Sequence, residues 1–235
     1  MWSSVRRKRE RCNGGFGSHP RSSVCDASKW LSYWFTLIGL LLSMSQGWPH
    51  DPAGIQPSKM VRQPIEGKAP EFTLVNQSGQ PVALRDLRGK VVLLTFTYSS
   101  CTGVCPLITR SMTVLQRRLT PEERQKIFFL SVTGDPEVDT PGILRTYAKR
   151  HGVDLTSWAF LTESPTVVRE VWQSFGMTVN ERAKGIVDHP GWTFLIDREG
   201  MVRYRYLGGA LEVKTVLEDM RKLQTQGLRV GSIDS

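Results

Sequence analysis

The fold of this chain is decided by the stretch Lys90-Val-Val-Leu-Leu-Thr-Phe-Thr-Tyr-Ser-Ser-Cys-Thr-Gly-Val-Cys-Pro106. Its first half is a continuous apolar run, which is typical of a buried strand. Pro106 suits the first position of a helix, where its missing N–H is not needed. A strand that ends in a loop feeding a helix is where α/β proteins commonly place their chemistry. We therefore expect the functional site at Cys101 and Cys105, the only two thiols after the chain's single strongly apolar segment.

Helical and strand patterns alternate on both sides of this stretch. We expect a β-hairpin over 72–84 that turns at Ser78-Gly79, strands over 90–97, 127–133 and 158–162, and a terminal hairpin over 192–197 and 201–206. Helices are expected over 106–119, 140–150, 164–175 and 211–223. The first of these helices shows one apolar face, made by Leu107, Ile108, Met112, Leu115 and Leu119. This order predicts an α/β domain with a mixed central sheet and helices on both faces.

The N-terminal part of the chain has a different character. Residues 1–29 form a basic head, and 30–46 contain the only uncharged apolar segment of membrane scale. That segment is shorter than the ~20 residues of a usual spanning helix, so it suits either a retained anchor or a signal-peptide core. We favour the anchor, with the head in the cytoplasm and the remainder outside it. Residues 47–68 read as a flexible tether, 69–225 as the globular domain, and 226–235 as a loose tail.

The net charge of +9 does not indicate nucleic-acid binding. Residues 1–29 carry seven basic and two acidic side chains, a charge of +5, which leaves +4 for all other residues. The domain shows no basic face interleaved with aromatic residues, so we expect no nucleic-acid partner.

The Cys-x-x-x-Cys spacing allows three kinds of site. Four positions apart on a helical turn, both sulfurs face the same side and can share one ion or one bond. The N-terminal dipole of the following helix lowers a thiol pKa and favours the thiolate. A structural disulfide would close a very short loop and restrict the unfolded chain little. Disulfide exchangers typically use Cys-x-x-Cys, so three intervening residues shift the interpretation towards a soft metal such as Cu(I) or Zn(II).

Few histidines are available as a third ligand. His19 and His50 lie before the domain, and His151 lies in the last turn of an expected helix, where a surface position is the usual reading. His189 lies in the loop just before the Trp192 strand, where a histidine is ordinarily only a turn residue.

A combination of motifs resembles the Sco (SenC) family of copper-binding cytochrome c oxidase assembly proteins. The motifs are the segment from Cys101 to Cys105, the run Ser131-Val-Thr-Gly-Asp-Pro-Glu-Val-Asp-Thr140, Val187-Asp-His189 followed by Thr193-Phe-Leu-Ile-Asp197, and the earlier Phe72-Thr-Leu and Leu87-Arg-Gly-Lys90. The resemblance covers roughly residues 69–223. It implies a thioredoxin-like mixed sheet flanked by helices, with the N-terminal hairpin as an extension and a single N-terminal membrane segment.

The resemblance also implies a site. It implies that Cys101, Cys105 and His189 bind one copper ion per chain, as Cu(I) or Cu(II), and that the two cysteines are a redox pair if the protein is active in thiol exchange. Asp135 matches the family's acidic residue near the metal, which implies that it supports the metal ligands or contacts the partner, although a turn and cap role is equally good. Thr102 departs from the proline that many members carry there. Asp188 could orient His189, whereas core packing is the better reading of Met112 and Met177.

The function implied is that of a copper chaperone that assists assembly of the dinuclear copper site of cytochrome c oxidase. Expected partners are the copper-bearing oxidase subunit or another cuproprotein, other copper chaperones, and the membrane. The expected location is the bacterial inner membrane with the domain in the periplasm, with the mitochondrial inner membrane second and secretion to the periplasm if the segment is cleaved. The alternatives are a thiol–disulfide oxidoreductase that reduces partner cysteines, in which His189 would be incidental, and a thiol peroxidase.

Overall fold

The computed structural model describes residues 59–177, 180–182, 186–188 and 191–226. The strands are β1 (Val61–Lys68), β2 (Thr73–Asn76), β3 (Pro81–Ala83), β4 (Val91–Thr97), β5 (Ile127–Thr133), β6 (Trp158–Thr162), β7 (Asn180–Arg182), β8 (Ile186–Asp188), β9 (Trp192–Ile196) and β10 (Met201–Leu207). The helices are the short 3-10 helix η1 (Leu84–Leu87), α2 (Cys105–Arg118), α3 (Pro121–Lys126), α4 (Pro141–Arg150), α5 (Pro165–Ser174) and α6 (Val213–Thr225).

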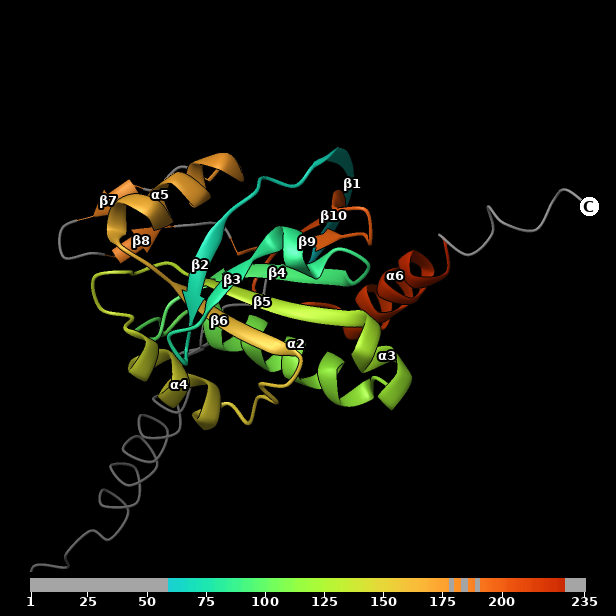
Figure 1. Cartoon of the computed structure of the whole chain (residues 1–235), viewed down its shortest axis with the longest axis horizontal. Helices are drawn as coiled ribbons and strands as arrows, with labels where there is room; N and C mark the ends of the chain where they lie inside the picture. Colours follow the sequence, from blue (N-terminus) through green and yellow to red (C-terminus); the bar gives the residue numbers. More distant parts are fainter. Residues whose placement is uncertain (1–58, 178–179, 183–185, 189–190, 227–235) are drawn as a thin grey trace, which may run out of the picture. The chain divides into compact units, whose positions relative to one another are not determined.

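Eight strands form one mixed sheet in the order β1-β10-β9-β4-β5-β6-β2-β3, and β7 pairs with β8 in a separate hairpin (Figure 1). The strands β4, β5 and β6 are parallel, and β9 runs antiparallel to β4. The carboxyl ends of β4 and β5 therefore lie at the same edge as the beginning of β9. This edge carries the loop that contains Cys101.

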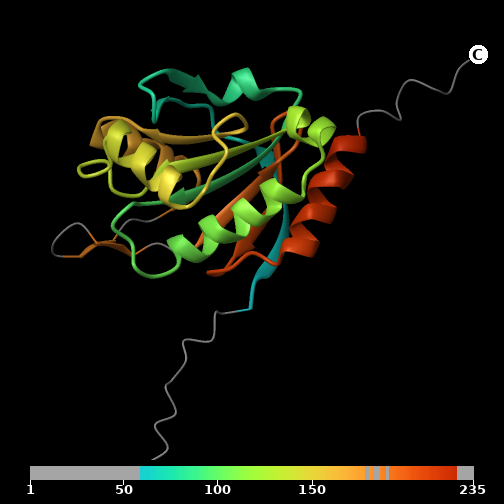
Figure 2. The same ribbon diagram turned by 90° about the horizontal axis from the view of Figure 1, so that it is seen from below.

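Two hydrophobic cores cover the two faces of the sheet, and β4 contributes to both. Its side chains alternate: Val91 and Leu93 pack with apolar residues of α2, α4 and α6. The neighbouring Val92 and Leu94 pack on the other face, where α5 and the hairpin β2–β3 supply the partners. In Figure 2, α2 and α6 lie side by side across the strands. A strand buried on both faces explains why this run is continuously apolar rather than alternating.

The expected mixed sheet with helices on both faces is confirmed. The expected hairpin is confirmed as β2 and β3, with Gly79 at φ 76° in its turn. Helix α6 begins at Val213, two residues later than expected. The expected inward position of Leu107 is wrong: its side chain is 42% exposed. The buried face of α2 follows the helical spacing of Ile108, Met112 and Leu115, and Leu107 lies a third of a turn away from it.

Strand β1 was not expected, because residues 47–68 were read as a flexible tether. Residues 61–68 instead pair antiparallel with β10 at the edge of the sheet. The side chains of this strand are mostly exposed, so its sequence lacks the apolar alternation that marks a half-buried strand. It also contains Pro64, a residue that sheets tolerate at an edge. Arg62 ties it down, since the guanidinium donates to both carboxylate oxygens of Asp219 on α6 at 2.7 and 2.8 Å.

The expected basic head, membrane segment and most of the tail lie outside the described residues. Within the described ranges, every helix is too short or too polar to cross a bilayer.

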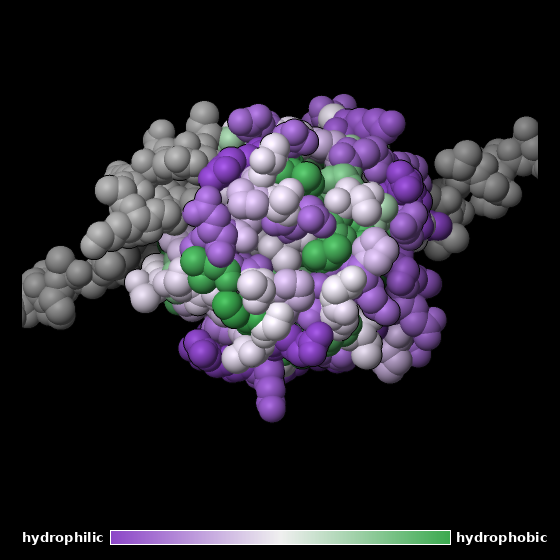
Figure 3. Space-filling view, turned by 60° about the vertical axis from the view of Figure 1, so that its left-hand side comes forward, coloured by the Kyte–Doolittle hydropathy of each residue, from purple (hydrophilic) through white to green (hydrophobic). Residues whose placement is uncertain are grey.

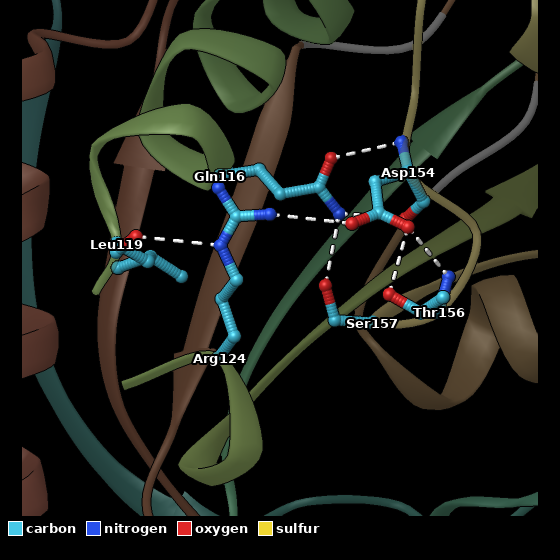
Figure 4. Close-up of polar contacts among 6 residues, drawn as sticks. All are labelled: Gln116, Leu119, Arg124, Asp154, Thr156 and Ser157. Atoms are coloured by element: carbon cyan, nitrogen blue, oxygen red, sulfur yellow. Dashed lines mark hydrogen bonds and ion pairs between the residues drawn. The ribbon is translucent and has the colours of Figure 1, made fainter. Parts of the chain in front are cut away.

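A buried polar network fixes the far end of α2 to the loop between α4 and β6 (Figure 4). The Gln116 side chain donates to the Asp154 carbonyl at 2.7 Å and to Ser157 Oγ at 3.0 Å, and it accepts from the Asp154 N–H at 3.1 Å. Arg124 closes the network by donating to the Asp154 carboxylate at 3.2 Å and to the Leu119 carbonyl at 3.3 Å. The helix that begins with Cys105 is thus held at its C-terminal end.

Replacing Gln116 by Leu is expected to lower the free energy of unfolding by about 2 kcal/mol, because the N–H and carbonyl of Asp154 lose their buried partner. Urea unfolding of the full-length chain measures the change. Gln173→Leu, on the exposed face of α5, is the matched control and should change stability by less than about 0.5 kcal/mol. Equal effects of the two substitutions would contradict the role of the network.

Candidate functional site

Cys101 and Cys105 lie at the junction between β4 and α2. Cys101 lies in the loop after β4, and its N–H donates to the Tyr98 carbonyl at 3.3 Å. Cys105 is the first residue of α2, and Pro106 follows it in the first turn, as expected from the sequence. Both cysteines are free thiols; Cys101 is partly exposed and Cys105 is fully buried. The structure thus brings the two predicted sulfurs together in unequal environments.

Hydrogen bonds to sulfur make Cys101 the thiolate of the pair. The side chain of Cys105 donates to it and is the largest cause that lowers the pKa of Cys101 to about 5. Burial opposes this shift, while the backbone N–H groups of Cys105 and Gly103 and the hydroxyl of Tyr98 strengthen it. For Cys105 the same hydrogen bond and the burial of its side chain raise the pKa well above its ordinary value. The pair therefore holds one proton between two sulfurs at neutral pH.

Tyr98 interacts with both cysteines and with Asp135. Burial, followed by the two cysteines and the charge of Asp135, raises the pKa of Tyr98, so the phenol remains a donor. Burial and the charge of Asp139 raise the pKa of Asp135. The backbone of Asp135 also shapes the turn before α4, where its carbonyl accepts from the N–H groups of Val138 and Asp139. Asp135 is therefore both a turn residue and near enough to influence Tyr98 electrostatically.

Asp139 organises the site, and the sequence analysis did not single it out. Its side chain is fully buried and accepts from the Ser99 N–H at 3.2 and 3.3 Å, from the Ser99 hydroxyl, and from the Thr133 hydroxyl at 2.6 Å. These bonds join the loop after β4 to the loop after β5. The signal available in the sequence was a second aspartate four positions after Asp135, directly before the helix cap Thr140.

Hydroxyl side chains replace apolar ones beneath the cysteines. Val91, Leu93, Ile127 and Phe129 pack in the core that α2 covers, and further along the same strands come the buried Thr95, Thr97, Ser131 and Thr133. Thr97 Oγ1 is buried without a hydrogen-bond partner among the described residues, yet it lies near enough to Cys105 to lower its pKa. Two adjacent soft sulfurs above a polar floor are a fitting donor set for a soft cation.

The third predicted ligand, His189, lies outside the described residues. The backbone of Asp188 ends β8, and its side chain is not described. The next described residue, Gly191, packs against α2: a Cβ on it would lie 3.1 Å from Ile108 Cδ1 and 2.6 Å from the Gly208 carbonyl oxygen. In the described parts of the chain, no group of three or more His, Cys, Asp or Glu side chains could hold a metal ion.

The remaining candidate residues have structural roles. His151 caps α4 at its C-terminal end and packs on the Tyr147 ring, with ring centroids 4.3 Å apart. Met112 and Met177 are buried in the two cores, as the packing interpretation predicted. Among the described residues, the two sulfurs are therefore the soft donors at this edge of the sheet.

Comparison with known proteins agrees with this arrangement. The SCO1/SenC family model matches residues 62–225. The SCO1 protein homolog of Bacillus subtilis (strain 168) is 31% identical over 153 residues, which cover 64% of this chain and 79% of that protein.

Two solved structures are similar as well. BsSco, a member of the Sco family of cytochrome c oxidase assembly proteins described with a disulfide switch, superposes with a TM-score of 0.60 and 28% identity, covering 69% of this chain and 96% of that chain. Bradyrhizobium japonicum ScoI with copper bound gives a TM-score of 0.55 and 25% identity over 67% of this chain and 99% of that chain. The thioredoxin-like mixed sheet expected from the sequence is thereby confirmed.

Alkylation by iodoacetamide is expected to report the unequal thiols. The alkylation rate of Cys101 should stay constant as the pH falls from 8 towards 6 and should decline only around pH 5, because the thiolate persists down to its lowered pKa. In Cys105→Ser the inflection should move to higher pH, because the thiol that donates to Cys101 has been removed. Mass spectrometry of the full-length chain measures both profiles. An inflection near pH 8.5 in the unmodified protein would contradict this description of the site.

Proposed function

Because the chain belongs to the SCO1/SenC family, we propose that it is a copper chaperone whose cargo is held by Cys101, Cys105 and His189. The family comprises copper-binding proteins of cytochrome c oxidase assembly, and we propose that this chain delivers copper to the oxidase's copper-bearing subunit or to another cuproprotein. The observation that carries the proposal is the pair of adjacent sulfurs, one of them a thiolate at neutral pH.

Soft thiolates select Cu(I), and an imidazole as third ligand also lets a site accept Cu(II). These three donors would bind one copper ion per chain. Cys101 is partly exposed, so an incoming thiolate from a partner can reach a cation bound there. Three protein ligands leave room for that incoming ligand, and copper can then pass by ligand exchange with no change in its oxidation state.

The position of Gly191, two residues after His189 in the sequence, supports His189 as the third ligand. A Cβ on Gly191 would lie 3.1 Å from Ile108 Cδ1, and Ile108 is three residues after Cys105. Two residues of chain reach only about 7 Å, so a ligand role for His189 is within the reach of the chain.

Disulfide exchange is a second candidate function, and the inequality of the thiols favours it. A half-exposed thiolate can attack a partner's disulfide, and a buried thiol such as Cys105 can then resolve the mixed disulfide. Oxidation of the pair would also remove both sulfur ligands, which would couple copper affinity to redox state. The comparisons do not favour the thiol peroxidase alternative. We further propose that residues 30–46 hold the protein at the bacterial inner membrane with the domain in the periplasm.

Substituting any one proposed ligand is expected to weaken Cu(I) binding by about a hundredfold or more, because each substitution removes one of three donors. Cys101→Ser, Cys105→Ser and His189→Ala are titrated anaerobically, in the full-length chain, against a competing Cu(I) chelator. His151→Ala is the matched control and should bind as tightly as the unmodified protein. Unchanged affinity in all three ligand variants would reject the copper proposal; unchanged affinity in His189→Ala alone would remove the imidazole from it.

Binding of Cu(I) at about pH 7.5 is expected to release about one proton per ion rather than two. Cys101 is already a thiolate because its pKa is lowered to about 5, whereas Cys105 keeps its proton until copper displaces it. Below about pH 5 both thiols are protonated, so the release should approach two. Calorimetric titrations in several buffers of different ionisation enthalpy give the number of protons released per Cu(I). A release of two protons at neutral pH would show that Cys101 is not a thiolate in the free protein.

A further inference from the structure

A pocket opens beside the cysteine loop and is not used by the proposed copper ligands. It has a volume of about 250 Å³ and is lined by Ser99 and by four residues of α4, Ile143, Thr146, Tyr147 and Arg150. These four occupy positions i, i+3, i+4 and i+7 of the helix, so they form one stripe along it. The stripe is roughly 10 Å long, from the rise of 1.5 Å per helical residue.

The end of this stripe near the cysteine loop is apolar and exposed. Ile143 is 40% exposed, and Val138, in the turn that leads into α4, is 45% exposed. Figure 3 views the molecule with the left-hand side of Figure 1 brought forward, the side at which β4 and β5 end, and it shows apolar patches set among polar residues on that face. Exposed apolar side chains rimmed by polar residues are typical of interaction sites.

The other end of the stripe is positively charged. Arg150 forms no ion pair or hydrogen bond with another described side chain. Burial and then the charge of Arg150 lower the pKa of the adjacent His151. Two other arginines are already paired: Arg145 donates to the Gln77 carbonyl at 2.8 and 3.1 Å, and Arg124 pairs with Asp154. As far as the described residues go, the Arg150 guanidinium is open to a carboxylate from outside the chain.

The pocket adjoins the loop that carries Cys101. Ser99 lines the pocket and is bonded to the buried Asp139, and Cys101 follows two residues later in the same loop. A chain segment lying along α4 from Arg150 to Ile143 would therefore approach the cysteine loop. An extended segment needs about three residues to span 10 Å.

We propose that this pocket binds the segment of the partner protein that carries its cysteine. An apolar side chain of that segment contacts Ile143 and Tyr147, and a carboxylate about three residues further along pairs with Arg150. The inference rests on the proposed function in taking the partner's thiol to be the group that meets Cys101. It adds the chemistry by which the partner is recognised.

The test uses hexapeptides whose single cysteine carries 2-nitro-5-thiobenzoate as a mixed disulfide. The Cys101 thiolate attacks the peptide's sulfur, a new disulfide forms between protein and peptide, and the nitrothiobenzoate thiolate leaves and is followed by its colour. One peptide has leucine near the cysteine and glutamate three residues after the leucine. Two others replace the leucine by serine or the glutamate by lysine.

With the full-length protein, we expect the leucine peptide to react about fivefold faster than the serine peptide, and the glutamate peptide about threefold faster than the lysine peptide. Ile143→Ser should abolish the first preference, and Arg150→Glu should reverse the second. The matched controls Leu155→Ser and Arg118→Glu, which alter an exposed leucine and an exposed arginine elsewhere, should keep both preferences.

Equal rates for all peptides in the unmodified protein would overturn the inference, as would variants of the pocket that behave like their controls. Sedimentation that shows a dimer broken by Ile143→Ser, or binding to anionic vesicles lost in Arg150→Glu, would assign the pocket to a second copy or to a membrane and would also overturn it. Cu(I) titration of the same variants separates this result from the proposed function: Ile143→Ser and Arg150→Glu should bind copper normally. If the unmodified protein does not bind copper but still shows both peptide preferences, the copper role is rejected and the pocket proposal stands.

Discussion

The carboxylate of Asp139 is fully buried between two loops, and the geometry of the cysteine site depends on it. It accepts hydrogen bonds from the backbone and side chain of Ser99 and from the Thr133 hydroxyl. A buried carboxylate is tolerated only where its oxygens are satisfied, so the loop after β4 and the end of β5 are held where they can satisfy it. The position of Cys101, two residues after Ser99, follows from this constraint. So does the pocket that Ser99 shares with α4.

Along β4 and β5, the side chains that face α2 change from apolar to hydroxylated towards the edge that carries the cysteines. At their beginnings, β4 and β5 send large apolar side chains towards α2, which anchors the helix by burial. At their ends, the residues in the same alternating positions are hydroxylated, and Thr193 on β9 joins them by donating to Thr95 at 3.2 Å. The helix is thus packed rigidly at its far end, where Gln116 is bound, and meets a polar floor at its N-terminus. The cation exchange proposed for these sulfurs would benefit from side chains that are held in place around the site.

The strongly apolar strands and the capped helices were predictable, because burial on both faces and the cap residues leave local signals. The run from Lys90 to Thr97 and the Thr140-Pro141 pair are examples, and both were placed correctly. Strand β1 was not predictable, because its stability comes from backbone pairing with β10 and from the distant Arg62–Asp219 pair. The cysteines were found through their spacing. The role of Asp139 was hidden, because it depends on a contact with Ser99 that spans forty residues. His189 stays a prediction from the family resemblance.

If the site binds copper as proposed, the single proton shared by the two sulfurs is a physical reason for a preference for Cu(I). Two thiolates side by side would repel each other, and the structure avoids this by leaving Cys105 protonated and bonded to the Cys101 thiolate. Exchange of that proton for Cu(I) replaces one unit of positive charge by another. The charge of the site is then unchanged, and the donors that already face Cys101, the N–H groups of Gly103 and Cys105 and the Tyr98 hydroxyl, need not reorganise. Under the copper proposal, Cu(II) would add a further positive charge to the site, which the negative charge of the Asp135 carboxylate would favour.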